Sequence, residues 1–405
     1  MSPTRIDPKI VGRRLVEARK ARGVTQEVAA EHIGVSRPTF IALEKGERPA
    51  KAVEIVKLAA FYGRQTHEFM RTSEPVADLQ PHLRAVADKM RATDAVELRL
   101  AIADLQRWAE DYRDLEQLMN APLRHNTPPE VVLGTRIDVL ELAEDVAGRE
   151  RRRLGLGDQP IIDLRRVLEW EVGLRIFYRK MPSHIAGMFA YDEGLGGCVL
   201  INRVHPAERR RASLLHEYGH LIVDRHKPGI DTLSVPGRKP ANERFAEAFA
   251  MSFLMPAASL RQRFHEIVTD TGDFQVADLV RLKHYYFVSM EAMTYRLEGL
   301  GLIPRGSWDL IQEEKLPVRE AERELGLSPN PVDDEIYPER YKFLAVHAFE
   351  RGELTESELS NTLRCDVVRA REIVLSCRTS LETEPNGERH SLVVDFQRSL
   401  LATAP

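Results

Sequence analysis

The chain has 405 residues, of which 43% are hydrophobic and 30% are charged, and its formal net charge is −4. This composition supports a packed core and excludes a disordered protein. The sequence has no apolar run near the roughly 20 residues that cross a bilayer, no secretory signal, and too few cysteines for a disulfide framework. We therefore expect a multidomain cytoplasmic protein without a membrane partner.

The charge is unevenly distributed along the chain. Residues 1–72 carry 14 Lys and Arg against 8 Asp and Glu, a net of +6, so the remainder carries −10. A basic segment ahead of an acidic body favours contact of that segment with a polyanion, although ordinary charge scatter is the alternative.

The first 70 residues have the pattern of short helices separated by turns. Thr25 and Ser36 are N-cap signals, and Gly34 between them can supply a tight turn. The pattern predicts four helices, over residues 8–22, 26–33, 37–44 and 51–62. This segment is assigned to a first domain, residues 1–72.

A helical connector follows, within residues 73–130. Residues 72–82 have the composition of a linker, and residues 83–119 again show helical spacing. The apolar stripe from Leu98 to Met119 contains three imperfect heptads, which suit either a packed connector or a dimerisation helix. Both interpretations stay open at this point.

The rest of the chain predicts a mainly α fold with a small β-sheet. One helix is expected over 136–154, three strands over 172–180, 185–192 and 197–202, and helices from residue 206 onward. A Pro-rich break at 328–339 lies inside the region assigned to a C-terminal helical module, residues 306–380, which a tail (381–405) follows. No internal repeat of useful length is evident.

The chemistry centres on a His-Glu-x-x-His motif. His216 and His220 are four residues apart, so a helix places both imidazoles on one face, where they can bind one metal ion. Glu217 is turned away by about 100° and can accept a proton from a metal-activated water. A histidine pair on an ordinary helix is the alternative.

A second helix, over 242–256, can complete this site. Glu243 and Glu247 again share one helix face, and the Pro- and Gly-containing stretch between the helices allows the chain to turn back. Glu243 is then the expected third ligand and Glu247 a second-shell partner of a histidine.

The two segments LLHEYGHLIVDRH and ERFAEAFAMSFLMP resemble the ImmA/IrrE family of metallopeptidases, and the match covers residues 131–305. The resemblance implies a zincin-like α+β domain with His216, His220 and Glu243 as metal ligands and Glu217 as general base. Zinc is the expected metal, with manganese and iron as alternatives. Glu247 stands where the family more often has Asp or Asn. Four side chains qualify by type to stabilise an oxyanion: His184, Tyr191, Tyr218 and His226.

Residues 10–63 resemble the phage-repressor-like (XRE) helix-turn-helix domain, on the pattern from Thr25 to Gly46. This resemblance implies binding to operator DNA, with the helix after Ser36 in the major groove. Base edges or phosphates are the expected contacts of Ser36, Arg37 and Thr39, and phosphates those of Gln26 and Lys45. Residues 354–374 faintly resemble another helix-turn-helix but lack a glycine turn, which favours packing or dimerisation there.

Together these features predict a homodimeric transcriptional regulator with a metal-dependent endopeptidase domain. Its expected substrate is a repressor, an antitoxin or the protein itself, in a phage, toxin–antitoxin or stress-response setting. The alternatives are a non-proteolytic regulator whose zincin-like domain senses metal or a small ligand, and a DNA-binding oligomer with a structural zinc.

Overall fold

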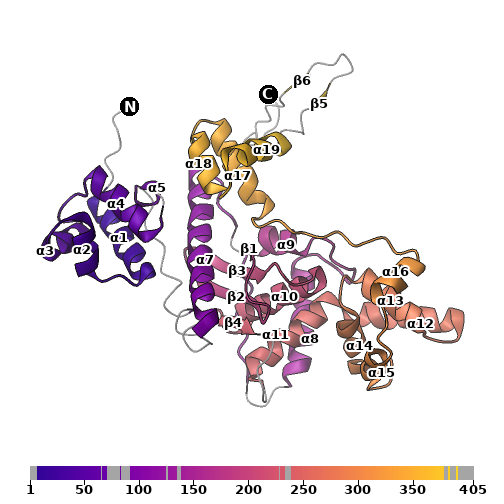
Figure 1. Ribbon diagram of the computed structural model, residues 1–405. Helices are drawn as coiled ribbons and strands as arrows, with labels where there is room; N and C mark the ends of the chain where they lie inside the picture. Colours follow the sequence, from indigo (N-terminus) through magenta and orange to yellow (C-terminus); the bar gives the residue numbers. More distant parts are fainter. Residues whose placement is uncertain are drawn as a thin grey trace, which may run out of the picture. The chain divides into compact units, whose positions relative to one another are not determined.

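The computed structural model describes most of the chain (Figure 1), namely residues 7–64, 66–70, 83, 92–124, 126–134, 138–227, 229–232, 239–377, 382–383 and 389–390. The expected linker at 72–82 and most of the expected tail lie outside these residues. The mainly α fold with a small sheet is confirmed. None of the described helices combines the length and the apolar character that crossing a bilayer requires.

The chain divides into two units. The first comprises Met1–Asp114 and Pro122–Pro338, and the second comprises Leu115–Ala121 and Glu339–Pro405. Two helices within the expected C-terminal module (residues 306–380) belong to the first unit, α15 (Ser307–Glu313) and α16 (Val318–Glu324).

The N-terminal helices form a small all-α body, here called the head. Its elements are α1 (Pro8–Arg22), α2 (Gln26–Ile33), α3 (Arg37–Glu44), α4 (Ala52–Tyr62) and α5 (Thr66–Phe69). Both predicted caps are confirmed: the Thr25 hydroxyl accepts from the N–H of Val28 at 3.3 Å, and the Ser36 hydroxyl from that of Thr39 at 3.4 Å. Gly34 makes the turn in the left-handed region, at φ 74°.

A buried polar cluster joins α1, α2 and α3 beside the apolar core of the head. Glu44 accepts from Arg19 Nε at 2.6 Å and from Gln26 Nε2 at 2.7 Å, and the Glu44 side chain is 3% exposed. The surrounding core consists of apolar side chains from all five helices, including Leu15, Ala29, Ile33, Phe40, Leu43, Leu58 and Phe69.

We expect Glu44→Ala to destabilise the head by about 3 kcal/mol, because the substitution leaves a partly buried guanidinium and carboxamide without their buried acceptor. Hydrogen exchange over residues 8–69, measured by mass spectrometry on the full chain, reports this opening free energy. Glu47→Ala is the matched control, since Glu47 makes only an exposed 4.0 Å pair with Lys45 and its loss should cost less than about 0.5 kcal/mol. Equal effects of the two substitutions would contradict the prediction.

The first unit also contains a four-stranded mixed sheet, in the order β1-β3-β2-β4. Its strands are β1 (Arg175–Arg179), β2 (Ile185–Asp192), β3 (Gly196–Asn202) and β4 (Gly229–Thr232). β1 runs parallel to β3, whereas β2 is antiparallel to both β3 and β4. The three predicted strands are confirmed, and β4 was not anticipated.

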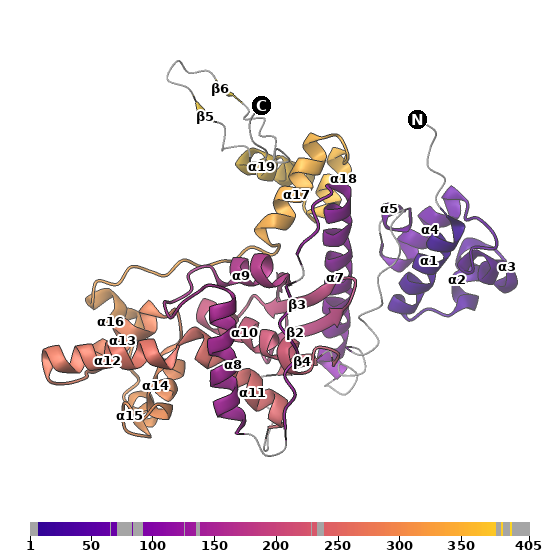
Figure 2. The same cartoon turned by 180° about the vertical axis from the view of Figure 1, so that it is seen from behind.

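Helices cover both faces of this sheet, which explains the nearly continuous apolar runs of its strands. α7 (Ala92–Leu118) lies alongside one face in both views (Figures 1 and 2). There Trp108 packs on Phe177 of β1, the Tyr112 hydroxyl donates to Glu169, and Arg179 Nε donates to Asp104 at 2.8 Å. The predicted α7 stripe is fully buried at Leu98, Ile102, Leu105, Ala109 and Tyr112, so this stripe serves as a packed connector.

The other face of the sheet packs on α10 (Ala207–Val223), the helix that carries the His-Glu-x-x-His motif. α10 in turn packs on α11 (Ala241–Leu254), and α11 packs on α8 (Val139–Arg153). The short α9 (Leu164–Val167) and a π-helical turn, η1 (Leu168–Val172), lead into β1. Three further helices extend the domain: α12 (Ala257–Thr271), α13 (Val276–Tyr285) and α14 (Met290–Gly299).

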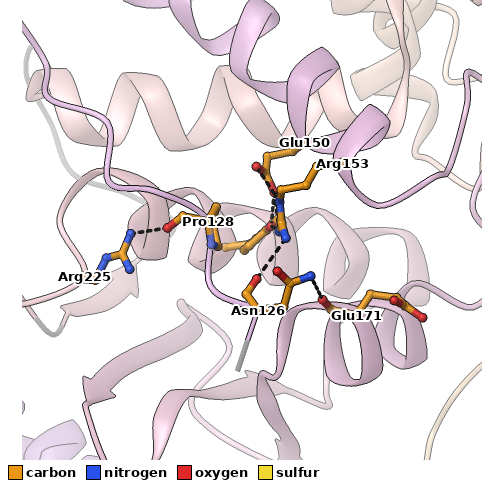
Figure 3. Close-up of polar contacts among 7 residues, drawn as sticks. Asn126, Pro128, Glu150, Arg153, Glu171 and Arg225 are labelled. Carbon is orange, nitrogen blue, oxygen red and sulfur yellow. Dashed lines mark hydrogen bonds and ion pairs between the residues drawn. The ribbon is translucent and has the colours of Figure 1, made fainter. Parts of the chain in front are cut away.

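Residues 126–134 lie in the connection between α7 and α8 and form no regular secondary structure. Two arginine side chains donate hydrogen bonds to backbone carbonyls of this segment (Figure 3). The Arg153 guanidinium lies between the Glu150 carboxylate and the Asn126 carbonyl, to which it donates at 3.1 Å. Arg225, just after α10, donates to the Pro128 carbonyl at 2.6 Å. These contacts hold the segment against the ends of α8 and α10.

Besides the last turn of α7, the described part of the second unit contains α17 (Glu339–Glu350), α18 (Glu356–Thr362) and α19 (Val367–Cys377). They pack on one another around Tyr341, Ala345, Leu359 and Ala370, all nearly fully buried. A short antiparallel pair, β5 (Glu382–Thr383) with β6 (Arg389–His390), follows them.

Candidate metal centre and nucleic-acid interface

Three side chains from two helices converge at the candidate metal centre. His216 Nε2 and His220 Nε2 on α10 are 3.1 Å apart, and the Glu243 carboxylate on α11 lies 3.3 Å from the first and 3.5 Å from the second. Tetrahedral zinc ligands, each about 2.0–2.1 Å from the metal, stand roughly 3.3–3.4 Å apart. The observed separations and the donor types therefore fit a divalent metal, as the sequence predicts.

Asp224, the residue directly after α10, orients one of these histidines. Its Oδ1 lies 2.9 Å from His220 Nδ1, and its Oδ2 accepts from Asn242 Nδ2 at 2.9 Å. The first contact turns Nε2 of His220 toward the site, and the second ties the start of α11, next to Glu243, to the end of α10. Sequence reasoning missed Asp224, although its position four residues after His220 was a usable signal.

Glu217 points into the protein and is 1% exposed. Its Oε1 has no hydrogen-bond partner among the described residues. A Cβ added to Gly187 of β2 would lie only 2.9 Å from this oxygen, so glycine leaves the space that the carboxylate occupies. Burial raises the pKa of Glu217 to about 8, against the opposing pull of His216 and His220. A buried carboxyl whose pKa lies near neutrality suits proton transfer.

The contacts among the three candidate ligands favour a charged carboxylate at Glu243 and a charged imidazole at His220. Hydrogen bonds from His216 and His220 hold the pKa of Glu243 far below its usual range. Burial opposes the charged form of His220, but hydrogen bonds to Asp224 and Glu243 outweigh it and raise its pKa to about 10. The Glu243 side chain is 37% exposed, so the cluster is open to solvent on the α11 side.

Glu247 does not make the expected second-shell contact. Its carboxylate pairs with Lys239, and the contact expected of it is made by Asp224. The physical reason is that Glu247 lies one helical turn beyond Glu243 along α11, where its carboxylate meets Lys239 from the loop before the helix.

The four oxyanion candidates have other contacts. The Tyr218 hydroxyl donates to Glu150 at 2.6 Å, on the side of α10 away from His216. His184 pairs with Asp94 at 3.3 Å. The ring of Tyr191 packs edge-on against that of His226.

Gly219, between the two histidines, sets the distance between α10 and α11. A Cβ there would lie 2.8 Å from Cα and 3.1 Å from Cβ of Ala246, one turn after Glu243. Because the obstacle is backbone, the helices must separate. We expect Gly219→Ala to weaken zinc binding by at least about tenfold and to cost about 1–3 kcal/mol of stability.

Zinc titration and thermal unfolding check this prediction. Gly148→Ala on α8 is the matched control, because its Cβ would meet only the Arg152 side chain at 3.5 Å. That substitution should stabilise the helix by about 0.5–1 kcal/mol and leave zinc affinity unchanged. Normal zinc affinity in Gly219→Ala would show that the close helix contact does not position Glu243.

Of the candidate DNA-contact residues, Ser36, Arg37 and Thr39 lie at the start of α3, Lys45 directly follows its end, and Gln26 begins α2. Ser36, Arg37 and Lys45 are exposed, and Arg37 makes no hydrogen bond or ion pair with another described residue. Thr39 Oγ1 lies 2.8 Å from Ser36 Oγ, so both hydroxyls take part in capping α3. The Gln26 amide is bound to Glu44, which fixes the start of α2 against α3.

In comparison with known proteins, the head and the metal centre match two different domain families. A helix-turn-helix domain model matches residues 10–70, and the peptidase M78 model, described as an IrrE N-terminal-like domain, matches residues 170–298.

Two curated relatives match the head. The cryptic phage CTXphi transcriptional repressor RstR of Vibrio cholerae is 39% identical over 62 residues, which are 15% of this chain and 56% of the repressor. An uncharacterized HTH-type transcriptional regulator of Methanothermobacter thermautotrophicus is 45% identical over 49 residues, 12% of this chain and 71% of that protein. The chain thus spans little more than half the length of the first relative.

Proposed function

Because the chain belongs to the helix-turn-helix transcriptional regulators and carries an IrrE N-terminal-like domain, we propose that it binds operator DNA and cleaves a protein partner to switch gene expression. The observation that carries the proposal is the convergence of His216, His220 and Glu243 beside the buried Glu217. A catalytic metal site combines three protein ligands with a neighbouring proton acceptor in this way.

The head supplies the DNA-binding part of the proposal. α3 starts with exposed Ser36 and Arg37, and a recognition helix presents its first residues to base edges in the major groove. Arg37 is the proposed reader of a guanine, Thr39 and Ser36 are proposed to contact base edges or phosphates, and Gln26 and Lys45 are proposed to contact phosphates. Such heads read two half-sites, so the acting species is proposed to be a homodimer.

The peptidase step is assigned to the residues around α10. Zinc held by His216, His220 and Glu243 would supply the Lewis acid that activates water and polarises the scissile carbonyl. The Glu217 carboxylate accepts the proton of the attacking water and later delivers it to the leaving amine. Asp224 keeps the His220 ring in its ligand orientation throughout.

The proposed substrate is a protein that controls transcription: a partner repressor, an antitoxin, or a second copy of this chain. The reason is that DNA binding and the candidate peptidase are joined in one polypeptide, so the head brings the peptidase to an operator where such proteins bind. A prophage, toxin–antitoxin or stress-response locus is the proposed setting.

The test is a cleavage survey with the zinc-loaded full-length protein. A library of peptides derived from bacterial proteins is incubated with it, and new termini are identified by mass spectrometry. Cleavage should occur, stop when a chelator removes the metal, and return when zinc is restored. A protein that binds one zinc ion per chain but generates no new termini in the library, in its partner repressors or in itself would contradict the peptidase function.

A regulator that senses metal without proteolysis is the second candidate, because the ligand cluster is partly open to solvent at Glu243. In that case zinc would change operator affinity in a mobility-shift assay, and the general base Glu217 would be dispensable for the change. Zinc-dependent operator binding that persists in Glu217→Gln would favour this function.

A further inference from the structure

The second unit repeats the local geometry of the head, 330 positions later in the chain. The repeat lies in α17–α19 and their connecting turns, residues 339–377, here called the C-terminal module. No repeat is evident in the sequence, because few residue identities are shared. The correspondence lies in caps, turns and hydrogen bonds.

The first correspondence is the cap of the first motif helix. Thr25 before α2 and Thr355 before α18 are both extended, with φ −76° in each. The Thr25 hydroxyl accepts from the N–H of Val28 at 3.3 Å, and the Thr355 hydroxyl accepts from that of Glu358 at 3.2 Å. Each helix thus begins with a threonine N-cap.

The second correspondence is the turn. Gly34 has φ 74°, and Arg364 adopts the same left-handed conformation at φ 50°. In each turn this residue donates to the carbonyl three positions back, at 3.0 Å in the head and 3.2 Å in the module. The next residue donates to the carbonyl five positions back, at 3.0 and 3.1 Å respectively.

The third correspondence is the start of the second motif helix and the core beneath it. Asp366 caps α19 by accepting from the N–H of Arg369 at 2.8 Å, as Ser36 caps α3. The buried positions match as well: Ala29, Ile33 and Phe40 of the head correspond to Leu359, Leu363 and Ala370 of the module. The module therefore has helix-turn-helix geometry, with α19 in the place of the recognition helix.

The C-terminal module has acidic or apolar residues at the positions where a DNA-binding helix-turn-helix has polar or basic ones. Glu356 and Asp366 occupy the positions of Gln26 and Ser36, which would place carboxylates against phosphates. The exposed Arg37 corresponds to Val367. Residues 339–377 carry six Lys and Arg against seven Asp and Glu, whereas residues 1–72 have a net charge of +6. Electrostatics therefore disfavours DNA as the ligand of α19.

The exposed side of α19 instead presents two apolar side chains among charged ones. Val368 is 66% exposed and Leu375 is 62% exposed, and their separation of seven positions places both on one helix face. Beside them lies a cavity of about 240 Å³, lined by Phe349, Leu359, Val374 and Leu375 with Glu356 and Arg371. In the head, the position of Val374 belongs to Glu44, whose polar cluster joins the three helices.

We infer that two copies of the chain associate through α19 and this cavity. The inference rests on the proposed function in one respect: a head that reads half-sites requires a second copy. The apolar stripe of α7, the other pairing candidate, is buried within its own chain. Exposed ion pairs lie next to these two apolar side chains, Arg369 with Glu372 and Arg371 with Glu356. A surface that carries both signs next to apolar side chains can meet the same surface of a second copy across a two-fold axis.

Sedimentation velocity of the full-length protein without DNA tests the inference. The wild type should sediment as a dimer at micromolar concentration. The double variant Val368→Glu/Leu375→Glu should raise the dimer dissociation constant by about 100-fold, since each charge placed in an apolar contact costs about a factor of ten. Hydrogen exchange over residues 339–377 verifies that the module stays folded, and Val368→Ser/Leu375→Ser serves as the milder variant.

The matched control is Val132→Glu/Ile162→Glu, which places two charges at apolar side chains of the first unit that are 83% and 67% exposed. This variant should remain a dimer. A monomeric wild type, or a dimer unaffected by either pair of changes at Val368 and Leu375, would overturn the inference. So would a variant that stays dimeric and loses operator affinity, because α19 would then contact DNA. Cleavage and half-site binding are measured separately, and their failure leaves the sedimentation result intact.

Discussion

Glu217→Gln should lower metal-dependent peptide cleavage by about 10²- to 10⁴-fold while zinc content stays at the wild-type level. The amide matches the carboxylate in shape and keeps the buried space beside Gly187 filled, but it cannot accept a proton. Glu217 supplies none of the three converging ligand atoms, so their positions do not depend on its charge. Rate measurement on a peptide cleaved by the wild type, beside metal analysis of both proteins, checks the prediction.

The control for this substitution is Glu208→Gln, the same chemical change in the first turn of the same helix. Cleavage and zinc content should both be normal in that variant. Cleavage at the wild-type rate by Glu217→Gln would remove the general base from the mechanism. Zinc loss in Glu217→Gln would instead show that this carboxylate belongs to the metal site itself.

Glu243→Ala should lose the bound zinc, and Glu247→Ala should retain it. Glu243 provides the only ligand from α11 among the described residues, and two histidines alone leave a site below the three protein ligands that a catalytic zinc requires. Glu247 lies on the same helix and has the same side chain, but it pairs with Lys239. Metal content by mass spectrometry after purification in zinc-containing buffer distinguishes the two variants.

Asp224→Asn provides an intermediate case in the same measurement. It removes the charge that orients His220 without removing a ligand. We expect zinc affinity about 10- to 100-fold below the wild type.

Equal zinc retention by Glu243→Ala and Glu247→Ala would reject the assignment of Glu243 as third ligand.

The head and the metal centre could be predicted because their signals are local. Thr25, Gly34 and Ser36 specify caps and a turn within a dozen residues, and each of them does in the structure what its residue type favours. His216 and His220 are fixed on one face by helical periodicity alone. Only the approach of Glu243 required a tertiary contact, and the turn signals before α11 were enough to expect it.

The missed features depend on contacts that no short pattern encodes. β4 consists of four residues with a glycine and an aspartate, and it is a strand because β2 offers it an edge. Glu247 lies on the same face of α11 as Glu243, so it was a reasonable candidate for contacting a histidine. That Asp224 makes this contact instead depends on where α10 ends and α11 begins, which the sequence pattern does not give. The C-terminal helix-turn-helix was obscured by Arg364, which adopts the conformation that glycine usually signals.

The lack of space above Gly187 has a consequence for comparing related chains. Any side chain there would meet the Glu217 carboxylate, the Ile201 side chain and the Leu200 carbonyl within 3.2 Å. A relative could therefore keep every letter of its His-Glu-x-x-His motif and still lose the proton acceptor's position through one change in a strand about 30 residues upstream. Residue 187 thus offers a marker for separating active from degenerate copies when genomes are surveyed for proteins of this kind.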